Sequence, residues 1–313
     1  MRLAALDLGS LTVRLAVAEG YGPGHRRIVH RGREITGLAE GMTNTGELAH
    51  PAMARTLAAV AHFAREIDRR QVERVLAVAT QAVRQARNRE AFLAEVRKVW
   101  PWPVEVLPPA AEARLTLAGV LSVLDPAVPA SGPVLVFDLG GGSTEFALIR
   151  PGQEPVLLSL PLGVLTLSQT RPLGDPPEPG RVAALQQELR ERLQNFRRER
   201  FPGLPGSGLR LVGTAGAVTT LAAMSLKMTA YDPERVNNLT LTRGQVEELA
   251  ALLMSHFEAE RARLPGVEAK KAPFMPAGAL IVLAVLEMCG AEGLTVSDAG
   301  LLEGVMAALA KES

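Results

Sequence analysis

Two segments of the chain repeat one pattern: an apolar run that ends in Asp-Leu-Gly, then small polar residues and a second apolar run. The segments are Ala4–Ala18 and Leu135–Ile149. Asp7 and Asp138 each close an apolar run that is typical of a buried strand. The glycines after each aspartate permit a tight turn and let backbone N–H groups approach an anion closely. The repeat therefore predicts two β-hairpins whose turns bind phosphate.

A hairpin with a glycine after aspartate is often an ordinary turn, and one copy alone would favour that interpretation. The second copy contains three consecutive glycines, Gly140–Gly142, where a stable hairpin needs fewer. Ordering such a run costs backbone entropy, so a ligand held against the backbone explains it better. The sequence contains no GxxxxGK[ST] string, which argues against a Walker-type nucleotide-binding fold.

Length and composition indicate a cytoplasmic enzyme with two domains. At 313 residues the chain is longer than most single domains. Its formal net charge of +1 gives no overall attraction to nucleic acid or to a membrane. The lone Cys289 excludes a disulfide within the chain, and no segment has the roughly 18 uncharged apolar residues that span a bilayer. We expect neither a nucleic-acid nor a membrane partner, and the sequence leaves a homodimer open.

The apolar periodicity predicts alternating strands and helices on both sides of a linker at Asp125–Gly132, which is rich in proline and small residues. Before the linker we expect strands at Leu3–Asp7, Val13–Ala18, Arg27–Ile35, Val75–Ala79 and Val104–Leu107, and helices at Pro51–Arg69, Arg89–Val99 and Ala111–Val123. After it we expect strands at Val134–Asp138, Thr144–Leu148, Val156–Leu160 and Arg210–Val212, and a helix at Glu178–Arg200. The economical architecture is α/β, with domains of residues 1–124 and 125–313 and a cleft between them.

Two further segments contain glycine motifs, and the first of them follows a predicted strand. Leu211–Leu221 opens a helix, which would direct helix N-terminal amides and Thr214 toward an anion. A plain strand-to-helix turn is the ordinary alternative there. Ser297–Gly304 repeats the pattern near the C-terminus, and Asp298 is either a helix N-cap, which we favour, or a residue of the cleft.

Several motifs follow one another in a fixed order over nearly the whole chain. They are DLGSLTVR at Asp7–Arg14, ATQAVRQARNREAFL at Ala79–Leu93, AEARLTLAGV at Ala111–Val120, FDLGGGSTE at Phe137–Glu145, GTAGAVTTLAA at Gly213–Ala223, YDPERV at Tyr231–Val236 and VSDAGLLEGV at Val296–Val305. In this order they resemble the exopolyphosphatase and guanosine-pentaphosphate phosphohydrolase family. The resemblance implies two ribonuclease H-like domains around a central cleft, the actin-like ATPase fold shared with sugar kinases and heat-shock ATPases.

The resemblance also implies a reaction. It is the magnesium-dependent release of the terminal phosphate of inorganic polyphosphate, or of the 5′ γ-phosphate of guanosine pentaphosphate, by in-line attack of water. Glu112 stands where the family places its catalytic glutamate and would act as the base for the water. Asp138 and Glu145 complete the catalytic set and are the candidate Mg²⁺ ligands, with Asp7 as an outer-shell candidate.

A polyanionic substrate needs many neutral donors and a few cations. Each candidate phosphate-binding residue offers a neutral donor or a positive charge. These residues are Gly9, Ser10, Thr12, Arg84, Gly140, Gly141, Gly142, Ser143, Thr144, Gly213, Thr214 and Gly216.

Most of these residues also have an ordinary structural interpretation. Glu112 is suited to the first turn of a helix, where the helix dipole favours a carboxylate. Arg84 and Arg87 are three residues apart on a predicted helix and could lie on its surface. Asp138, at the end of an apolar strand, has no comparable alternative.

The chain departs from the family pattern at several positions, and these departures remove charges and donors from the expected cleft. They are Leu11 in place of an amide side chain, Gly37 in place of arginine, Pro108–Ala111 in place of Ser-Gly and adjacent acids, Asn237 and Asn238 in place of His-Gly, the lack of an acid near Pro273, and Leu302 in place of arginine.

Two interpretations of the departures compete. The chain is a divergent enzyme for a shorter or less charged phosphate substrate, or a catalytically weakened sensor that binds polyphosphate or a guanosine alarmone. Retention of Glu112, Asp138 and Glu145 favours the enzyme. An actin-like ATPase or kinase would share the two hairpins and is a third, weaker alternative.

Overall fold

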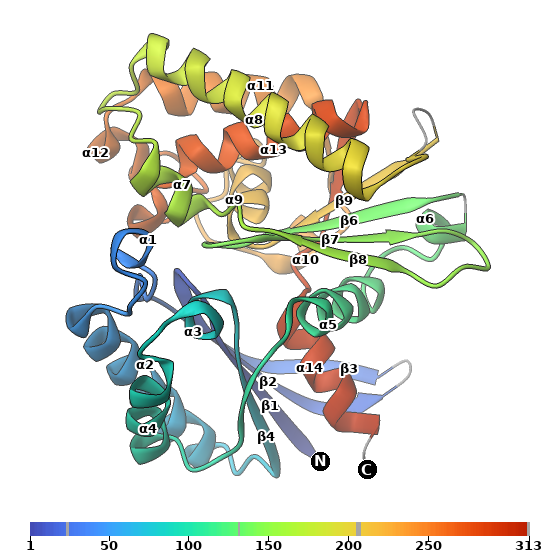
Figure 1. Cartoon of the computed structure of the whole chain (residues 1–313). Helices are drawn as coiled ribbons and strands as arrows, with labels where there is room; N and C mark the ends of the chain where they lie inside the picture. Colours follow the sequence, from blue (N-terminus) through green and yellow to red (C-terminus); the bar gives the residue numbers. More distant parts are fainter. Residues whose placement is uncertain (23–24, 131, 205–207, 312–313) are drawn as a thin grey trace. The chain divides into compact units, whose positions relative to one another are not determined.

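The computed structural model describes residues 1–22, 25–130, 132–204 and 208–311 (Figure 1). Its contacts divide the chain into two units. The first unit consists of Met1–Ser122, Gly140–Ser143 and Ala299–Ser313, and the second of Val123–Leu139 and Thr144–Asp298. Each unit is built around one mixed β-sheet.

The described residues of the first unit form a five-stranded sheet in the order β3-β2-β1-β4-β5. The strands are β1 (Arg2–Leu8), β2 (Thr12–Gly22), β3 (His25–Ile35), β4 (Arg74–Ala79) and β5 (Val104–Val106). The first three are antiparallel neighbours, whereas β1, β4 and β5 are parallel. Every residue of β1 after Arg2 is buried, as expected for a strand covered on both faces.

Helices of the first unit are α1 (Met42–Thr45), α2 (His50–Arg69), α3 (Gln81–Gln85), α4 (Arg89–Val99), α5 (Pro109–Leu121) and α14 (Leu301–Lys311). The C-terminal helix α14 packs against α5 and against β1 and β2 (Figure 1). One apolar cluster joins α14 to the sheet: Leu3, Ala5, Ala16, Ala18, Val78, Leu107, Leu301, Leu302, Val305, Met306 and Leu309.

Helix α14 belongs to the first unit, whereas the sequence predicted a second domain that runs over residues 125–313 and includes this helix. Two glycines allow its close contact with α5. A Cβ at Gly119 would lie 1.8 Å from the Gly300 carbonyl oxygen, and a Cβ at Gly304 would lie 1.8 Å from that of Leu115. Only glycine permits such an approach of backbone to backbone. This long-range contact leaves no signal in local periodicity.

The described residues of the second unit form a six-stranded sheet in the order β10-β11-β9-β6-β7-β8. The strands are β6 (Val134–Leu139), β7 (Thr144–Ile149), β8 (Val156–Leu160), β9 (Arg210–Thr214), β10 (Thr240–Thr242) and β11 (Gly293–Val296). Here β6, β7 and β8 are antiparallel, β6, β9 and β11 are parallel, and β10 is antiparallel to β11. The second sheet thus repeats the first, with β6 in the place of β1.

The second unit contains α6 (Ala127–Ala130), α7 (Val164–Thr170), α8 (Pro179–Arg200), α9 (Gly216–Ser225), α10 (Pro233–Val236), α11 (Arg243–Ser255), α12 (Glu258–Arg261), a 3-10 turn η1 (Ala269–Lys271) and α13 (Met275–Cys289). Helix α13 is buried along almost its whole length because it packs against α7, α8, α9 and α11. No helix in the described part of the chain is long and apolar enough to cross a membrane.

The predicted linker at Asp125–Gly132 is tied into the second unit. It contains α6, and Ser131 lies outside the described residues. Asp125 Oδ1 accepts from Ala127 N, and Asp125 N donates to Asn238 Oδ1 over 3.0 Å. Asn238 Nδ2 donates to the Val123 carbonyl over 3.0 Å. Asn238 has a φ of +62°, a conformation that asparagine tolerates better than most residues, so this departure from the family pattern has a structural role.

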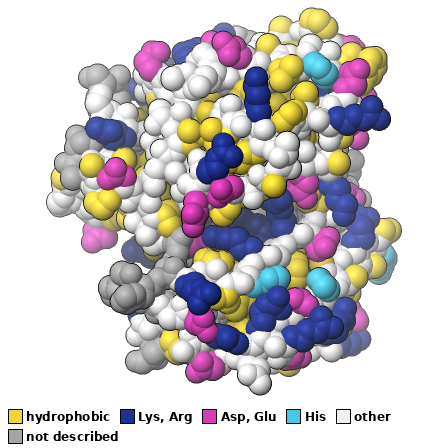
Figure 2. Space-filling model, turned by 180° about the vertical axis from the view of Figure 1, so that it is seen from behind, with side chains coloured by type: hydrophobic (Ala, Val, Ile, Leu, Met, Phe, Trp, Pro, Cys, Tyr) yellow, Lys and Arg dark blue, Asp and Glu magenta, His cyan; other side chains and the backbone are white. Residues whose placement is uncertain are grey.

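Charges on the surface are interspersed. On the face displayed in Figure 2, Lys and Arg side chains lie among Asp and Glu side chains. Exposed pairs such as Lys98 with Glu95 at 2.7 Å, and Arg243 with Glu247 at 2.9 Å, offset one another locally. Exposed pairs of this kind add little stability, but they agree with the near-zero formal net charge.

Candidate functional site

The turn of the first hairpin is held by backbone hydrogen bonds on both sides. Gly9 N donates to the Thr12 carbonyl over 3.1 Å, and the Leu11 carbonyl accepts from the backbone N–H groups of Thr36 and Gly37. A Cβ at Gly9 would lie 2.8 Å from the Thr12 oxygen, so the turn requires glycine there. Ser10, at the tip, is 5% exposed. The predicted phosphate-binding residues of this hairpin therefore lie in a rigid turn.

Asp7 is paired with an arginine on the neighbouring strand. Asp7 and Arg14 are opposite each other in the β1–β2 ladder, and Asp7 Oδ2 accepts from Arg14 Nε over 3.0 Å and from Nη2 over 2.7 Å. Asp7 Oδ1 is buried and has no hydrogen-bond partner among the residues that the structure describes. One oxygen of the predicted outer-shell carboxylate is thus engaged, and the other is left for a donor or a cation.

The glycine turn of the second hairpin, Gly140–Ser143, belongs to the first unit. Gly140 N donates to the Ser143 carbonyl over 2.9 Å, and Ser143 is 4% exposed. A Cβ at Gly141 would lie 2.7 Å from Leu11 Cβ. A Cβ at Gly142 would lie 1.9 Å from Gln81 Oε1 and 2.8 Å from Ser10 Oγ. Close packing therefore explains part of the three-glycine run that the sequence analysis attributed to a ligand.

Arg84 and Glu112 meet in the first unit. Arg84, on α3, donates from Nη1 to Glu112 Oε2 over 2.9 Å and to the Leu107 carbonyl over 2.6 Å. The two side chains are only 17% and 10% exposed. Glu112 lies in the first turn of α5, where the helix dipole also favours a carboxylate. The predicted base and the predicted phosphate-binding arginine are thus brought together as one ion pair.

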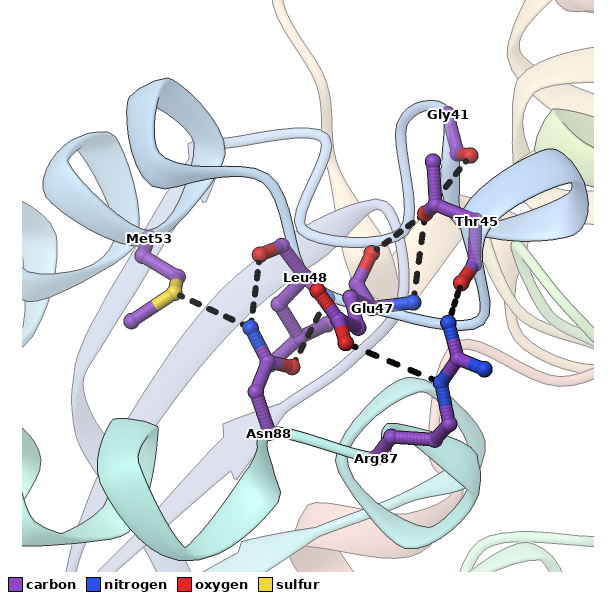
Figure 3. A network of polar contacts seen from close by, with 7 residues as sticks. All are labelled: Gly41, Thr45, Glu47, Leu48, Met53, Arg87 and Asn88. Atoms are coloured by element: carbon purple, nitrogen blue, oxygen red, sulfur yellow. Dashed lines mark hydrogen bonds and ion pairs between the residues drawn. The ribbon is translucent and has the colours of Figure 1, made fainter.

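The segment after α3 is fastened to the loop that contains α1 (Figure 3). Asn88 Nδ2 donates to the Leu48 carbonyl, and Asn88 Oδ1 accepts from Leu48 N, each over 2.9 Å. Arg87 donates from Nη2 to the Thr45 carbonyl, and its Nε lies 3.6 Å from Glu47 Oε1. Arg87 follows the end of α3 and serves this contact, which helps to fix the helix that carries Arg84.

In the second unit, Asp138 and Glu145 are opposite each other on the neighbouring strands β6 and β7. Glu145 is 4% exposed, and its Oε1 accepts from Ser159 Oγ over 2.8 Å. Thr144, beside it, donates its hydroxyl to the Leu162 carbonyl over 2.5 Å and is fully buried. The structure therefore brings the two predicted metal ligands together and directs the Thr144 hydroxyl to the protein backbone.

The strand-to-helix turn at Gly213–Gly216 has an unusual backbone. Ala215 has φ +74° and ψ −179°, a region occupied almost only by glycine. Thr214, the last residue of β9, is 2% exposed, and Gly216 begins α9. A Cβ at Gly213 would lie 2.7 Å from the Phe137 ring, so this glycine serves packing. Strain of this kind gathers at functional sites, which agrees with the predicted anion-binding turn.

Lys271 lies beside this turn and was missed by the sequence analysis. Its side chain is buried, with 7% of the residue exposed, and its Nζ would lie 3.5 Å from a Cβ at Gly216. Glu268 Oε2 is 3.7 Å from the same Nζ. A cation at a helix N-terminus suits anion binding. The lysine stands in the 3-10 turn η1, far from any glycine motif, so no sequence pattern pointed to it.

Asp298 was expected to cap a helix, and this prediction is wrong. Helix α14 begins at Leu301, and Gly300 N donates to Glu303 Oε2 over 2.9 Å. Asp298 instead accepts the Tyr231 hydroxyl, while its own N–H donates to Asn237 Oδ1 over 2.8 Å.

The comparisons with known proteins agree with this geometry. The model of the Ppx/GppA phosphatase family matches residues 18–313. The chain belongs to the Ppx/GppA phosphatase family. Exopolyphosphatase 2 of Mycobacterium tuberculosis (strain CDC 1551 / Oshkosh) is 33% identical to it over 327 residues, which cover 99% of this chain and 98% of that protein.

Solved structures of the family have the same fold. The crystal structure of the Aquifex aeolicus Ppx/GppA family member has a TM-score of 0.80 at 34% identity and covers 100% of this chain and 98% of that one. The crystal structure of an exopolyphosphatase-like protein has a TM-score of 0.88 at 25% identity, with coverage of 100% and 99%. The family resemblance and the α/β fold with actin-like ATPase-type domains are confirmed.

Proposed function

We propose that the chain is an exopolyphosphatase, which releases terminal phosphate from inorganic polyphosphate by attack of water. The observation that carries the proposal is the ion pair of Arg84, on α3, with Glu112, on α5; Gln81 of the same helix α3 packs at the glycine turn. Membership of a phosphatase family, with a relative named exopolyphosphatase over nearly the full length, supports it.

The residues of the first unit suit this reaction. The Ser10 hydroxyl and the backbone of the two glycine turns would supply neutral donors for phosphate oxygens, whereas the N–H groups of Gly9 and Gly140 already donate to the carbonyls of Thr12 and Ser143. Glu112 would take the proton of the attacking water, while Arg84 holds its carboxylate in one orientation. A positioned base of this kind contributes about 10²–10⁴ in rate. Thr12, half-buried on β2, adjoins the first turn.

The second unit offers further groups for a polyanion. The strained turn at Ala215, the N-terminus of α9 and the nearby Lys271 would bind phosphate oxygens. A lysine ammonium suits this task as a point charge.

We further propose Mg²⁺ as the cofactor. No group of three or more His, Cys, Asp or Glu side chains fit for a metal ion occurs within residues 1–22, 25–130, 132–204 and 208–311. Mg²⁺ is often held by one or two carboxylates and keeps several waters, so the facing pair Asp138 and Glu145 fits it. The buried Oδ1 of Asp7, without a partner among the described residues, fits an outer-shell role. When bound, the ion would neutralise charge on the transferred phosphoryl group.

We favour polyphosphate over guanosine pentaphosphate as the substrate, because the relative from Mycobacterium tuberculosis is named an exopolyphosphatase. Guanosine pentaphosphate, the other substrate implied by the family resemblance, should be assayed in parallel.

The test measures phosphate release from long-chain polyphosphate with Mg²⁺. We expect the parent to be active and Glu112→Gln and Asp138→Asn to lose at least about 10²-fold in kcat, because each substitution keeps the shape and removes the charge. Glu105→Gln is the matched control, since Glu105 is exposed on β5, and it should retain parental activity. If the parent binds polyphosphate in calorimetry and releases no phosphate, the result would instead favour a catalytically weakened sensor that binds polyphosphate.

A further inference from the structure

Gln81 has a buried side-chain oxygen, Oε1, to which the proposed reaction assigns no role. It is the first residue of α3 and is 6% exposed. Its Oε1 is buried and finds no hydrogen-bond partner in the part of the chain that the structure describes. Buried side-chain oxygens in native proteins are nearly always hydrogen-bonded, so an exception calls for a partner such as a water or a ligand.

The position of this oxygen identifies its surroundings. A Cβ at Gly142 would lie 1.9 Å from Gln81 Oε1, so the oxygen lies directly against the glycine turn, with Ser10 Oγ close to the same point. Arg84 follows Gln81 by three residues on α3, and residues at this spacing share a helix face. Arg84 in turn holds Glu112. The acceptor therefore lies at the glycine turn, on the same short helix as the arginine that holds the proposed base.

The chemistry of an acceptor decides what it can bind. Backbone N–H groups of a glycine turn and a hydroxyl such as that of Ser10, which lies at the turn, suit the oxygens of a phosphate. Gln81 Oε1 has lone pairs and no proton, so a phosphoryl oxygen would be repelled from it. A water molecule can donate one O–H to Gln81 Oε1 and the other to a carboxylate.

We infer that Gln81 orients the attacking water by accepting one of its two O–H bonds, an inference that rests on the proposed function. The water oxygen attacks the terminal phosphorus, and the bond from that phosphorus to the bridging oxygen breaks. The electron pair leaves on the shortened chain, and Glu112 takes the other water proton. Gln81 neither gains nor loses a proton. Groups that orient the attacking water recur in phosphoryl transfer.

The first test replaces the carboxamide by an apolar side chain of the same length, Gln81→Met. We expect kcat for polyphosphate to fall about 10²-fold while KM stays within about twofold, because a misplaced nucleophile slows the chemical step and leaves substrate binding intact. The matched control is Gln85→Met, since Gln85 is exposed on the same helix, and it should match the parent. Thermal melting checks that each variant is folded.

A second variant, Gln81→Glu, separates an acceptor from a donor. Glutamate keeps an oxygen for the water and adds a negative charge near phosphate. We expect it to retain kcat within about tenfold of the parent while KM rises, so that its kcat exceeds that of Gln81→Met. If Gln81 instead donated from Nε2 to phosphate, glutamate would be worse than methionine in kcat, and the inference would be overturned.

Binding is measured separately in the Glu112→Gln background, where we expect polyphosphate to be consumed at least about 10²-fold more slowly. Adding Gln81→Met should leave the calorimetric Kd unchanged within about twofold, which a phosphate-binding residue would not do. A folded Gln81→Met with parental kcat overturns this inference alone and leaves the proposed function standing. A parent that releases no phosphate overturns the proposed function, and the inference with it.

Discussion

Several residues that depart from the family pattern serve the structure in their own unit. Leu11 packs against Gly141, and Leu302 lies in the apolar cluster between α14 and the sheet. Asn237 and Asn238 hold Asp298 and the Asp125 segment by hydrogen bonds. These side chains are therefore used for packing and hydrogen bonds within the protein, whereas Glu112, Asp138 and Glu145 are the residues that we propose for the reaction.

Cys289 provides a test of burial at the residue scale. Burial raises the pKa of the Cys289 thiol to about 12, against an ordinary value of 9.0, although Arg197 lowers it in part. The thiolate is the reactive form, so we expect iodoacetamide at pH 8 to alkylate the native protein on the order of 10³-fold more slowly than the unfolded chain. Mass spectrometry of timed samples measures the rate.

The same shift predicts a loss of stability in base. Burial raises the pKa of the Cys289 thiol in the folded state. The contribution of the protonated thiol to the free energy of unfolding is therefore complete below pH 9 and is lost as the pH rises from 9 toward 12. Between pH 8 and pH 10 the parent should lose about 1 kcal/mol more free energy of unfolding than Cys289→Ala. Equal losses in the two proteins would contradict the assigned burial.

At the scale of elements, local patterns predicted most of the fold. The helix at Arg89–Val99 and the strand at Val156–Leu160 were predicted with their observed bounds, because alternation and helical periodicity are local properties. The β1–β2 and β6–β7 hairpins were predicted from the Asp-Leu-Gly repeat for the same reason.

Features that depend on contacts distant in sequence were not predicted. The packing of α14 on α5 joins residues nearly two hundred positions apart, as Gly304 and Leu115 illustrate. The candidate site divides in the same way. Motifs identified Arg84 and Glu112, but neither their ion pair nor the roles of Gln81 and Lys271 can be inferred from one residue's neighbours in the chain.

Glycine substitutions test the contact between α14 and α5. Gly304→Ala should lower the free energy of unfolding by more than about 3 kcal/mol, because its Cβ would lie 1.8 Å from the Leu115 carbonyl oxygen. Gly180→Ala, in the first turn of α8, is the control. A Cβ there meets no described atom within 4 Å, so we expect a change under about 1 kcal/mol, which urea unfolding would measure. Similar values for both variants would refute the close contact.

At the scale of the whole molecule, each unit repeats one sheet topology and each carries groups suited to phosphate. The first unit contains both glycine turns, the Arg84–Glu112 pair and Gln81. The second contains the facing carboxylates Asp138 and Glu145 and the strained turn before α9. The repeat in the sequence is therefore also a repeat of structure.

The most direct test of the proposed reaction is polyphosphate hydrolysis in ¹⁸O-labelled water with Mg²⁺, followed by mass analysis of the released phosphate. Attack of water on the terminal phosphorus predicts one ¹⁸O atom in each inorganic phosphate as it is released. Glu112→Gln should release almost none. Unlabelled phosphate from the parent, with the label retained in the shortened chain, would place the attack on the penultimate phosphorus and contradict the proposed mechanism.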